Sequence, residues 1–107
     1  MSSSQMLKGI LDGCLLAIIG KGETYGYEMI EKLEMYGFHM ISEGSIYPVL
    51  LRLQKDGFVK SVMKESPSGP KRKYYTLTPS GEEEYREFKE RGENLSESVN
   101  RLVKEEI

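Results

Sequence analysis

Two β-prone segments on either side of a run of turn-forming residues constrain the possible folds more than any other feature of the sequence. Residues 58–64 and 72–77 are rich in aromatic and β-branched side chains, which favour extended strands. Residues 66–70, Ser-Pro-Ser-Gly-Pro, combine the residue types that form turns. The pattern therefore predicts a β-hairpin with a basic far side.

The chain before this hairpin has the spacing of amphipathic helices. Residues 5–19 place apolar side chains at helical intervals, and glycines in residues 20–22 end this predicted helix. A second helix is expected over residues 25–36, with Thr24 as its N-cap and Gly37 closing it. The expected core face of this second helix is Met29, Ile30 and Leu33.

A third helix is predicted over residues 43–56, between a cap at Ser42 and a terminating Gly57. Pro48 lacks an N–H, so it should bend the start of this helix or mark a later beginning. The apolar spacing predicts that the core face consists of Ile46, Val49, Leu50 and Leu53.

A long final helix is predicted from Thr78, its N-cap, through Pro79 at its first position. This divides the chain into a domain over residues 1–78 and a C-terminal helix over residues 79–107. The apolar residues of the helix follow a coiled-coil spacing, which would leave its far end exposed unless a second chain covered it. We therefore expect a homodimer whose interface includes Met6, Ile10, Phe88, Leu95, Val99 and Leu102.

The predicted order of elements is three helices, a hairpin and a long helix. The fold class is therefore mainly α with a β-hairpin, a winged helix-turn-helix followed by a dimerisation helix. A helix about 10–12 Å wide fits the major groove of DNA, which is about 12 Å wide. On the third helix we expect Ser45 and Tyr47 to meet base edges, and Arg52 and Lys55 to contact phosphates. In the hairpin, the expected phosphate contacts are Lys71, Arg72 and Lys73.

The charge distribution agrees with a nucleic-acid partner, although the net charge is −2. Residues 41–79 carry seven Lys and Arg against three Asp and Glu, whereas both flanks are acidic. Local charge decides whether a surface attracts phosphate. The expected partner is double-stranded DNA with a pseudo-palindromic operator.

Three segments resemble the PadR family of transcriptional regulators. Residues 43–53, Glu-Gly-Ser-Ile-Tyr-Pro-Val-Leu-Leu-Arg-Leu, are similar to its recognition-helix signature. Residues 25–28, Tyr-Gly-Tyr-Glu, resemble its second-helix segment, and residues 72–81 resemble its second wing strand and the entry to the last helix. The similarity runs from about residue 8 to residue 90, and the single final helix resembles the short subfamily. This resemblance implies a dimeric repressor, often relieved by small phenolic or drug-like ligands.

An effector site is an open alternative at the predicted dimer interface. Met6, Tyr85 and Phe88 could line a pocket for a small aromatic ligand, or they could simply form dimer core. The chain contains no tryptophan, so a device that stacks drugs between tryptophans is not available to it.

Other classes of function find little support in the sequence. No Gly-rich phosphate loop or catalytic triad spacing is present, so we expect no enzyme and no cofactor. His39 and Cys14 lack partner ligands, so no metal site is expected. Without a long apolar run or a signal peptide, the expected location is the cytoplasm and no membrane is a partner. The alternative function is a winged-helix protein-interaction adaptor that does not bind DNA.

Overall fold

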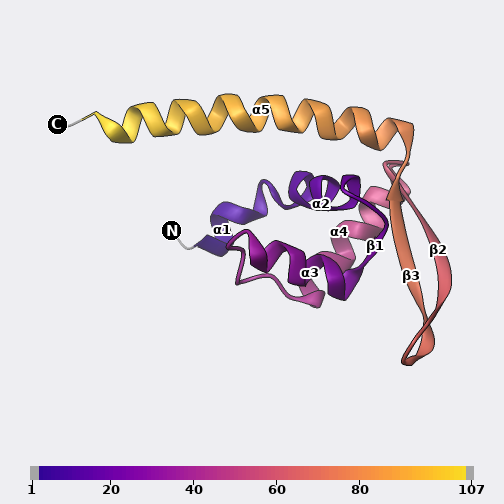
Figure 1. Ribbon diagram of the computed structural model, residues 1–107. Coiled ribbons are helices and arrows are strands. Elements are labelled where there is room, and N and C mark those ends of the chain that lie inside the picture. The colour runs from indigo at the N-terminus through magenta and orange to yellow at the C-terminus, as the bar shows by residue number, and fades with distance from the viewer. Residues whose placement is uncertain (1–2, 106–107) are drawn as a thin grey trace.

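The computed structural model describes residues 3–105, and over this range the chain forms helices around a small antiparallel sheet (Figure 1). The sheet order is β1-β3-β2, so the predicted hairpin gains a short third strand. This arrangement confirms the mainly helical fold class with a winged helix-turn-helix and a long C-terminal helix. The elements are α1 (Ser3–Lys8), α2 (Leu11–Gly20), β1 (Thr24–Tyr25), α3 (Gly26–Met35), α4 (Glu43–Lys55), β2 (Val59–Ser66), β3 (Gly69–Leu77) and α5 (Pro79–Lys104).

The prediction of a single helix over residues 5–19 is wrong, because the structure divides this segment into α1 and α2 at Gly9 and Ile10. The Ile10 N–H donates to the Leu7 carbonyl at 2.9 Å, which closes a turn between the two helices. Glycine in a helix interior costs about 1 kcal/mol relative to alanine, so this position favours the break. Leu7 and Leu11, one on each side of the turn, are both buried.

The predicted N-cap role of Thr24 is also wrong. Thr24 belongs to β1, pairs with Tyr75 of β3 and is fully buried. Its hydroxyl donates to the Glu28 carboxylate at 2.6 Å, and Tyr25 occupies the cap position without a side-chain bond. This hydrogen bond is the main reason that the pKa of Glu28 is lowered. Thr24 therefore ties the edge strand to α3.

Helix α4 begins where it was predicted to begin, so the alternative of a later start is wrong. The Ser42 carbonyl accepts the N–H groups of Ser45 and Ile46, although the Ser42 side chain makes no cap bond. Pro48 lies inside the helix, where it removes the N–H that would otherwise bond the Gly44 carbonyl. Gly44 lies in the exposed first turn, where water can satisfy that carbonyl.

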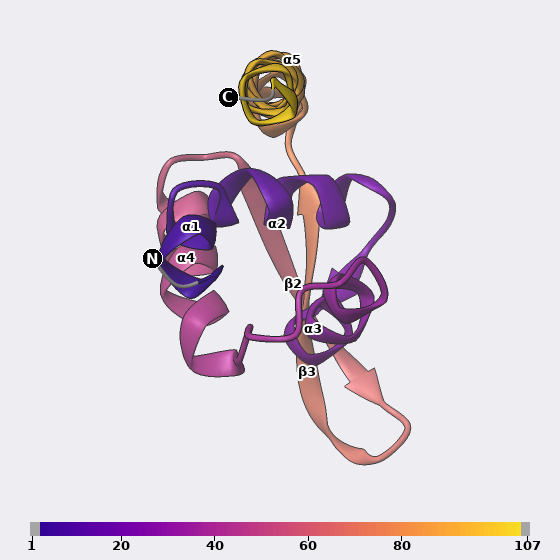
Figure 2. The same ribbon diagram turned by 90° about the vertical axis from the view of Figure 1, so that its left-hand side faces the viewer.

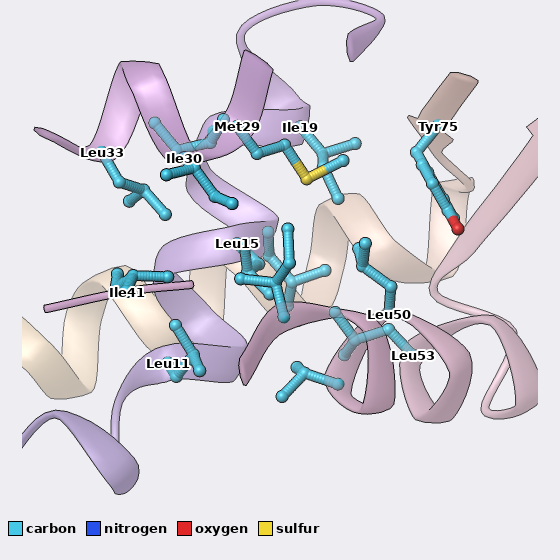
Figure 3. Close-up of a cluster of buried hydrophobic side chains, with 14 of the residues drawn as sticks. Leu11, Leu15, Ile19, Met29, Ile30, Leu33, Ile41, Leu50, Leu53 and Tyr75 are labelled. Carbon is cyan, nitrogen blue, oxygen red and sulfur yellow. The ribbon is translucent and has the colours of Figure 1, made fainter. Parts of the chain in front are cut away.

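The core lies between α2, α3 and α4 and is closed on one side by the sheet (Figure 3). The predicted core faces of α3 and α4 are confirmed, because every residue named for them is buried. Figure 3 shows Ile30, Leu33 and Leu50 gathered around Leu15 of α2, which is fully buried. The labelled cluster contains Leu11, Leu15, Ile19, Met29, Ile30, Leu33, Ile41, Leu50, Leu53 and Tyr75.

Helix α5 runs along the side of the molecule opposite the hairpin tip, and in the end-on view it lies over α2 (Figures 1 and 2). Its predicted cap is confirmed, since the Gly81 N–H donates to the Thr78 hydroxyl at 3.0 Å. Two glycines permit close approach at its first half. A Cβ on Gly81 would overlap the Phe58 carbonyl, and a Cβ on Gly13 of α2 would overlap the Phe88 ring. Within the described range, no helix has the length and apolar character needed to cross a bilayer.

Candidate nucleic-acid interface

The start of α4 presents polar and aromatic side chains on the surface away from the core. The predicted residues Ser45, Tyr47, Arg52 and Lys55 are all exposed, with 46% of Tyr47 accessible. The opposite face of the same helix is buried in the core. The helix is therefore held by one face and leaves the other available for a partner.

A cleft of about 360 Å³ brings the start of α4 together with the wing, the hairpin of β2 and β3. Tyr47 lines it from α4, and the three predicted wing cations line it from β3. Ser45, Arg52 and Lys55 are not among the lining residues. The hairpin tip extends away from α5, so this end of the molecule is free of the C-terminal helix (Figure 1). The full lining is Tyr25, Gly26, Tyr27, Glu43, Tyr47, Lys71, Arg72, Lys73 and Tyr75.

Tyr47 is seated against the first residue of α3. A Cβ on Gly26 would lie 2.7 Å from the Tyr47 Oη, so a larger residue at that position would displace the tyrosine ring. Partial burial, with the nearby Glu43 carboxylate, raises the pKa of Tyr47. The phenol therefore stays protonated at neutral pH and can donate a hydrogen bond to a phosphate or a base edge.

The wing cations do not share one face. Successive side chains of a strand point to opposite sides, so Lys71 and Lys73 lie on one face of β3 and Arg72 on the other. Lys71 and Lys73 are exposed. The Arg72 guanidinium lies 4.5 Å from the centre of the Tyr25 ring and is half-buried. The three adjacent cations therefore lie in two different environments, with Lys71 and Lys73 in one and Arg72 in the other.

Arg52 contacts another helix of its own chain. Its guanidinium donates to both oxygens of Asp12 on α2, at 2.6 and 2.7 Å. This pairing raises the pKa of Arg52. The contact joins α4 to α2, the helix beneath α5.

The cleft contains residues that the sequence analysis did not single out as site residues, including Tyr27, Glu43 and Tyr75. Tyr25 and Gly26 were noted only as part of a family-like segment. For Tyr75 the sequence did contain a signal. Tyr74 and Tyr75 are adjacent in a predicted strand, so their side chains must lie on opposite faces of the sheet. The short strand β1, which places Tyr25 beside Tyr74, has too few residues to show a pattern of its own.

A second hollow lies between the first two helices and α5. Its volume is about 970 Å³, and most of its lining surface is apolar. It brings together the predicted effector residues and most of the predicted dimer residues, although Leu102 is not among its lining. The exposed fractions of Leu95, Val99 and Leu102 are 63%, 50% and 72%. The predicted residues that line it are Met6, Ile10, Tyr85, Phe88, Leu95 and Val99.

The remaining groups that could act as a nucleophile or as metal ligands are Cys14, His39 and the acidic side chains. Burial raises the pKa of the Cys14 thiol, which leaves it protonated at neutral pH. Between residues 3 and 105, no three His, Cys, Asp or Glu side chains gather in a way that could hold a metal ion.

A buried three-helix core, a helix with a free polar start and a basic hairpin beside it define a winged helix-turn-helix protein. The chain belongs to the PadR-like family of transcriptional regulators, whose family model matches residues 15–87. Members of this family are transcriptional regulators and not enzymes.

Solved structures and curated proteins agree with this assignment. A PadR-like transcriptional regulator from Bacillus cereus is 51% identical, with a TM-score of 0.86 over 95% of this chain and 99% of that one. The structure of Bacillus subtilis PadR in complex with operator DNA is 31% identical, with a TM-score of 0.66 over 74% of this chain and 46% of that one. In sequence, the negative transcriptional regulator PadR of Bacillus subtilis is 30% identical over 84% of this chain and 50% of its own length.

Proposed function

We propose that this protein is a homodimeric repressor that binds a pseudo-palindromic DNA operator. The observation that carries the proposal is the cleft in which Tyr47 of α4 and the wing lysines Lys71 and Lys73 line one space. A recognition helix and a cationic hairpin at the same end of the molecule suit a major groove and its adjacent phosphates. The related Bacillus subtilis PadR, solved with operator DNA, supports the same partner for this chain.

The residues of the interface divide into two roles. Ser45 and Tyr47, at the free start of α4, are proposed to contact base edges. Lys71 and Lys73 are proposed to contact phosphates, together with Lys55 in the last turn of α4. Arg52 is proposed to contact phosphate less strongly than the lysines, because the Asp12 carboxylate takes one of its guanidinium nitrogens and neutralises part of its charge.

The exposed apolar residues of α5 support a dimer. Leu95, Val99 and Leu102 recur at steps of four and three, and a second copy of the chain can bury them. A two-fold dimer would place two α4 helices in major grooves about one helical turn, roughly 34–36 Å, apart. This spacing is the reason for proposing an operator with two half-sites.

The hollow lined by Met6, Tyr85 and Phe88 supports ligand-relieved repression. Its volume, about 970 Å³ in one chain, is in the range that small-molecule sites have, and its aromatic and methionine lining suits a flat apolar molecule. A ligand that favours one separation of the two α4 helices would shift the population toward or away from DNA binding.

A fluorescence-anisotropy titration of the purified protein against a random-sequence duplex tests DNA binding. Affinity should fall by about 10³-fold between roughly 50 and 200 mM salt if about six phosphates are neutralised. The variant Lys73→Ala should weaken binding to all sequences and make the log–log salt slope shallower by about one. Absence of binding at the lower salt would overturn the proposal and favour an adaptor that binds protein.

Sequence specificity needs a second comparison. An operator selected by the wild-type protein from a random library should bind Tyr47→Ala more weakly by about 10-fold or more, while binding to random duplexes changes little. If Tyr47→Ala keeps its preference for the selected operator, the assignment of Tyr47 to base readout is wrong.

A further inference from the structure

The outer face of the wing carries a stack of aromatic and cationic side chains from all three strands. The Arg72 guanidinium lies 4.5 Å from the centre of the Tyr25 ring, and the Tyr25 and Tyr74 rings meet edge-on at 5.3 Å. Lys64 continues the series, with its ammonium 5.4 Å from the Tyr74 ring and paired with Glu23. We call Tyr25, Lys64, Arg72 and Tyr74 the wing stack.

The strand register explains how these residues meet. Tyr25 is paired with Tyr74, and Lys64 with Arg72, so all four side chains lie on the same face of the sheet. Strand β1 contains only two residues, and β3 continues past it toward the hairpin tip. Arg72 reaches from the part of β3 that extends beyond β1 back to Tyr25, at the point where the chain enters α3.

Arg72 is held at a second point near the tip of the hairpin. Its guanidinium donates to the Ser68 hydroxyl at 3.0 Å, and Ser68 lies in the turn between β2 and β3. One side chain thus bridges the tip of the wing and the edge strand of the body. Within residues 3–105, no hydrogen bond or ion pair holds the neighbouring Lys71 and Lys73 in this way. They are exposed, and the Lys73 ammonium is 6.0 Å from the Tyr75 ring, at the outer limit for a cation–π contact.

We propose that Arg72 is a positioning residue that fixes the angle of the wing against Tyr25, while Lys71 and Lys73 make the phosphate contacts. This inference rests on the proposed function and refines it, because it separates three adjacent cations by role. The guanidinium suits this role because its plane lies over the ring while a terminal nitrogen donates to Ser68, a fork geometry that a compact ammonium does not reproduce.

Pre-organisation predicts a specific pattern of affinity and salt dependence. If Arg72 holds the wing in place, its loss adds a cost of ordering the hairpin on binding but leaves the lysine–phosphate contacts in the complex. Affinity should therefore fall at every salt concentration without a change of salt slope. A residue that contacts phosphate directly should change the slope by about 0.9 instead.

The experiment compares Arg72→Lys, Arg72→Gln and Tyr25→Leu in the full-length protein, by anisotropy on one random-sequence duplex over a range of salt. We expect each variant to bind about five- to tenfold more weakly than wild type, with an unchanged slope. Tyr25→Phe keeps the ring, so it should lose less affinity than Tyr25→Leu, with the same salt slope. The double variant Tyr25→Leu/Arg72→Lys should lose less affinity than the sum of the two single losses, because both substitutions remove the contact between Arg72 and Tyr25.

Lys73→Gln is the matched control for charge, and it should make the slope shallower. Wild-type binding by Arg72→Lys, or a slope change in Arg72→Gln equal to that in Lys73→Gln, would overturn the positioning role. Additive losses in the double variant would also overturn it. Failure of the proposed function gives a different result, since the wild-type protein itself would then not bind the duplex.

Discussion

The winged-helix body and the far half of α5 use the same kinds of apolar residue in opposite ways. In the body, Leu15, Ile46 and Leu50 are fully buried by other parts of the same chain. In the far half of α5, Leu95 and Leu102 are more than 60% exposed. The body therefore buries its own apolar side chains, whereas the far half of α5 leaves an apolar surface exposed. Under the proposed function, this difference separates the molecule into an end that binds DNA and an end that pairs with a second chain.

The first prediction concerns a substitution in the core of the winged-helix body. Leu50→Ala should lower the free energy of unfolding by about 2–5 kcal/mol, because it leaves a cavity in a fully packed core. Leu51→Ala is the matched control: Leu51 is the next residue of α4 and is 67% exposed, so the change should be within about 0.5 kcal/mol. Urea unfolding at one fixed protein concentration measures both. Equal losses for the two variants would contradict the assignment of the core.

The second prediction concerns a substitution in the far half of α5. Val99→Glu places a charge in the exposed apolar stripe of α5 and should raise the dissociation constant of the dimer by about 100-fold or more. The body should stay folded, because Val99 contributes nothing to its buried cluster. Sedimentation equilibrium gives the constant, and Asn94→Glu on the same exposed half of α5 is the control. A dimer as tight as the wild type in Val99→Glu would place the interface elsewhere.

The third prediction compares two glycines of α5, Gly81 where the helix packs on the body and Gly92 further along it. Gly81→Ala should destabilise the protein by about 1–3 kcal/mol, because its new Cβ would overlap the backbone carbonyl of Phe58. Gly92→Ala should stabilise it by about 0.5–1 kcal/mol, because alanine favours the helix and its new Cβ would lie 4.0 Å from the Phe88 ring, an ordinary van der Waals contact. Thermal unfolding measures both changes. The same sign for both substitutions would show that α5 is seated on the body differently.

The fourth prediction concerns the contact that links α4 to α2. Asp12→Asn should cost less than about 1 kcal/mol, because the ion pair with Arg52 is exposed and is screened by salt. Freeing the Arg52 guanidinium should also strengthen DNA binding slightly at low salt, by a few-fold. Urea unfolding and anisotropy at about 50 mM salt measure these effects. Weaker DNA binding by Asp12→Asn would indicate that the pair positions α4 for binding.

Regular apolar spacing made most of the fold predictable from the sequence. The core faces of α3 and α4, the hairpin and the Thr78 cap all follow from short-range patterns. The break at Gly9 was missed because the apolar residues keep the same spacing on both sides of it. Strand β1 and the buried role of Thr24 depend on pairing with residue 75, far along the chain, which no local pattern shows.

The candidate site was predictable in composition but not in arrangement. Tyr47 and the wing cations could be named from their places on a helix and a hairpin, and they do line one cleft. The pairing of Arg52 with Asp12 joins residues 40 positions apart, so it follows only from the packing of α2 against α4. The separation of Arg72 from its two lysine neighbours follows from strand alternation together with the position of Tyr25.

The number of chains that bind one duplex tests most directly the claim that one end reads DNA while the other pairs two chains. Sedimentation of the wild-type protein with a selected operator should give two chains per duplex. Val99→Glu should need much higher concentrations to reach the same complex, although its body is intact. A single wild-type chain bound per operator, with affinity unchanged in Val99→Glu, would contradict the account.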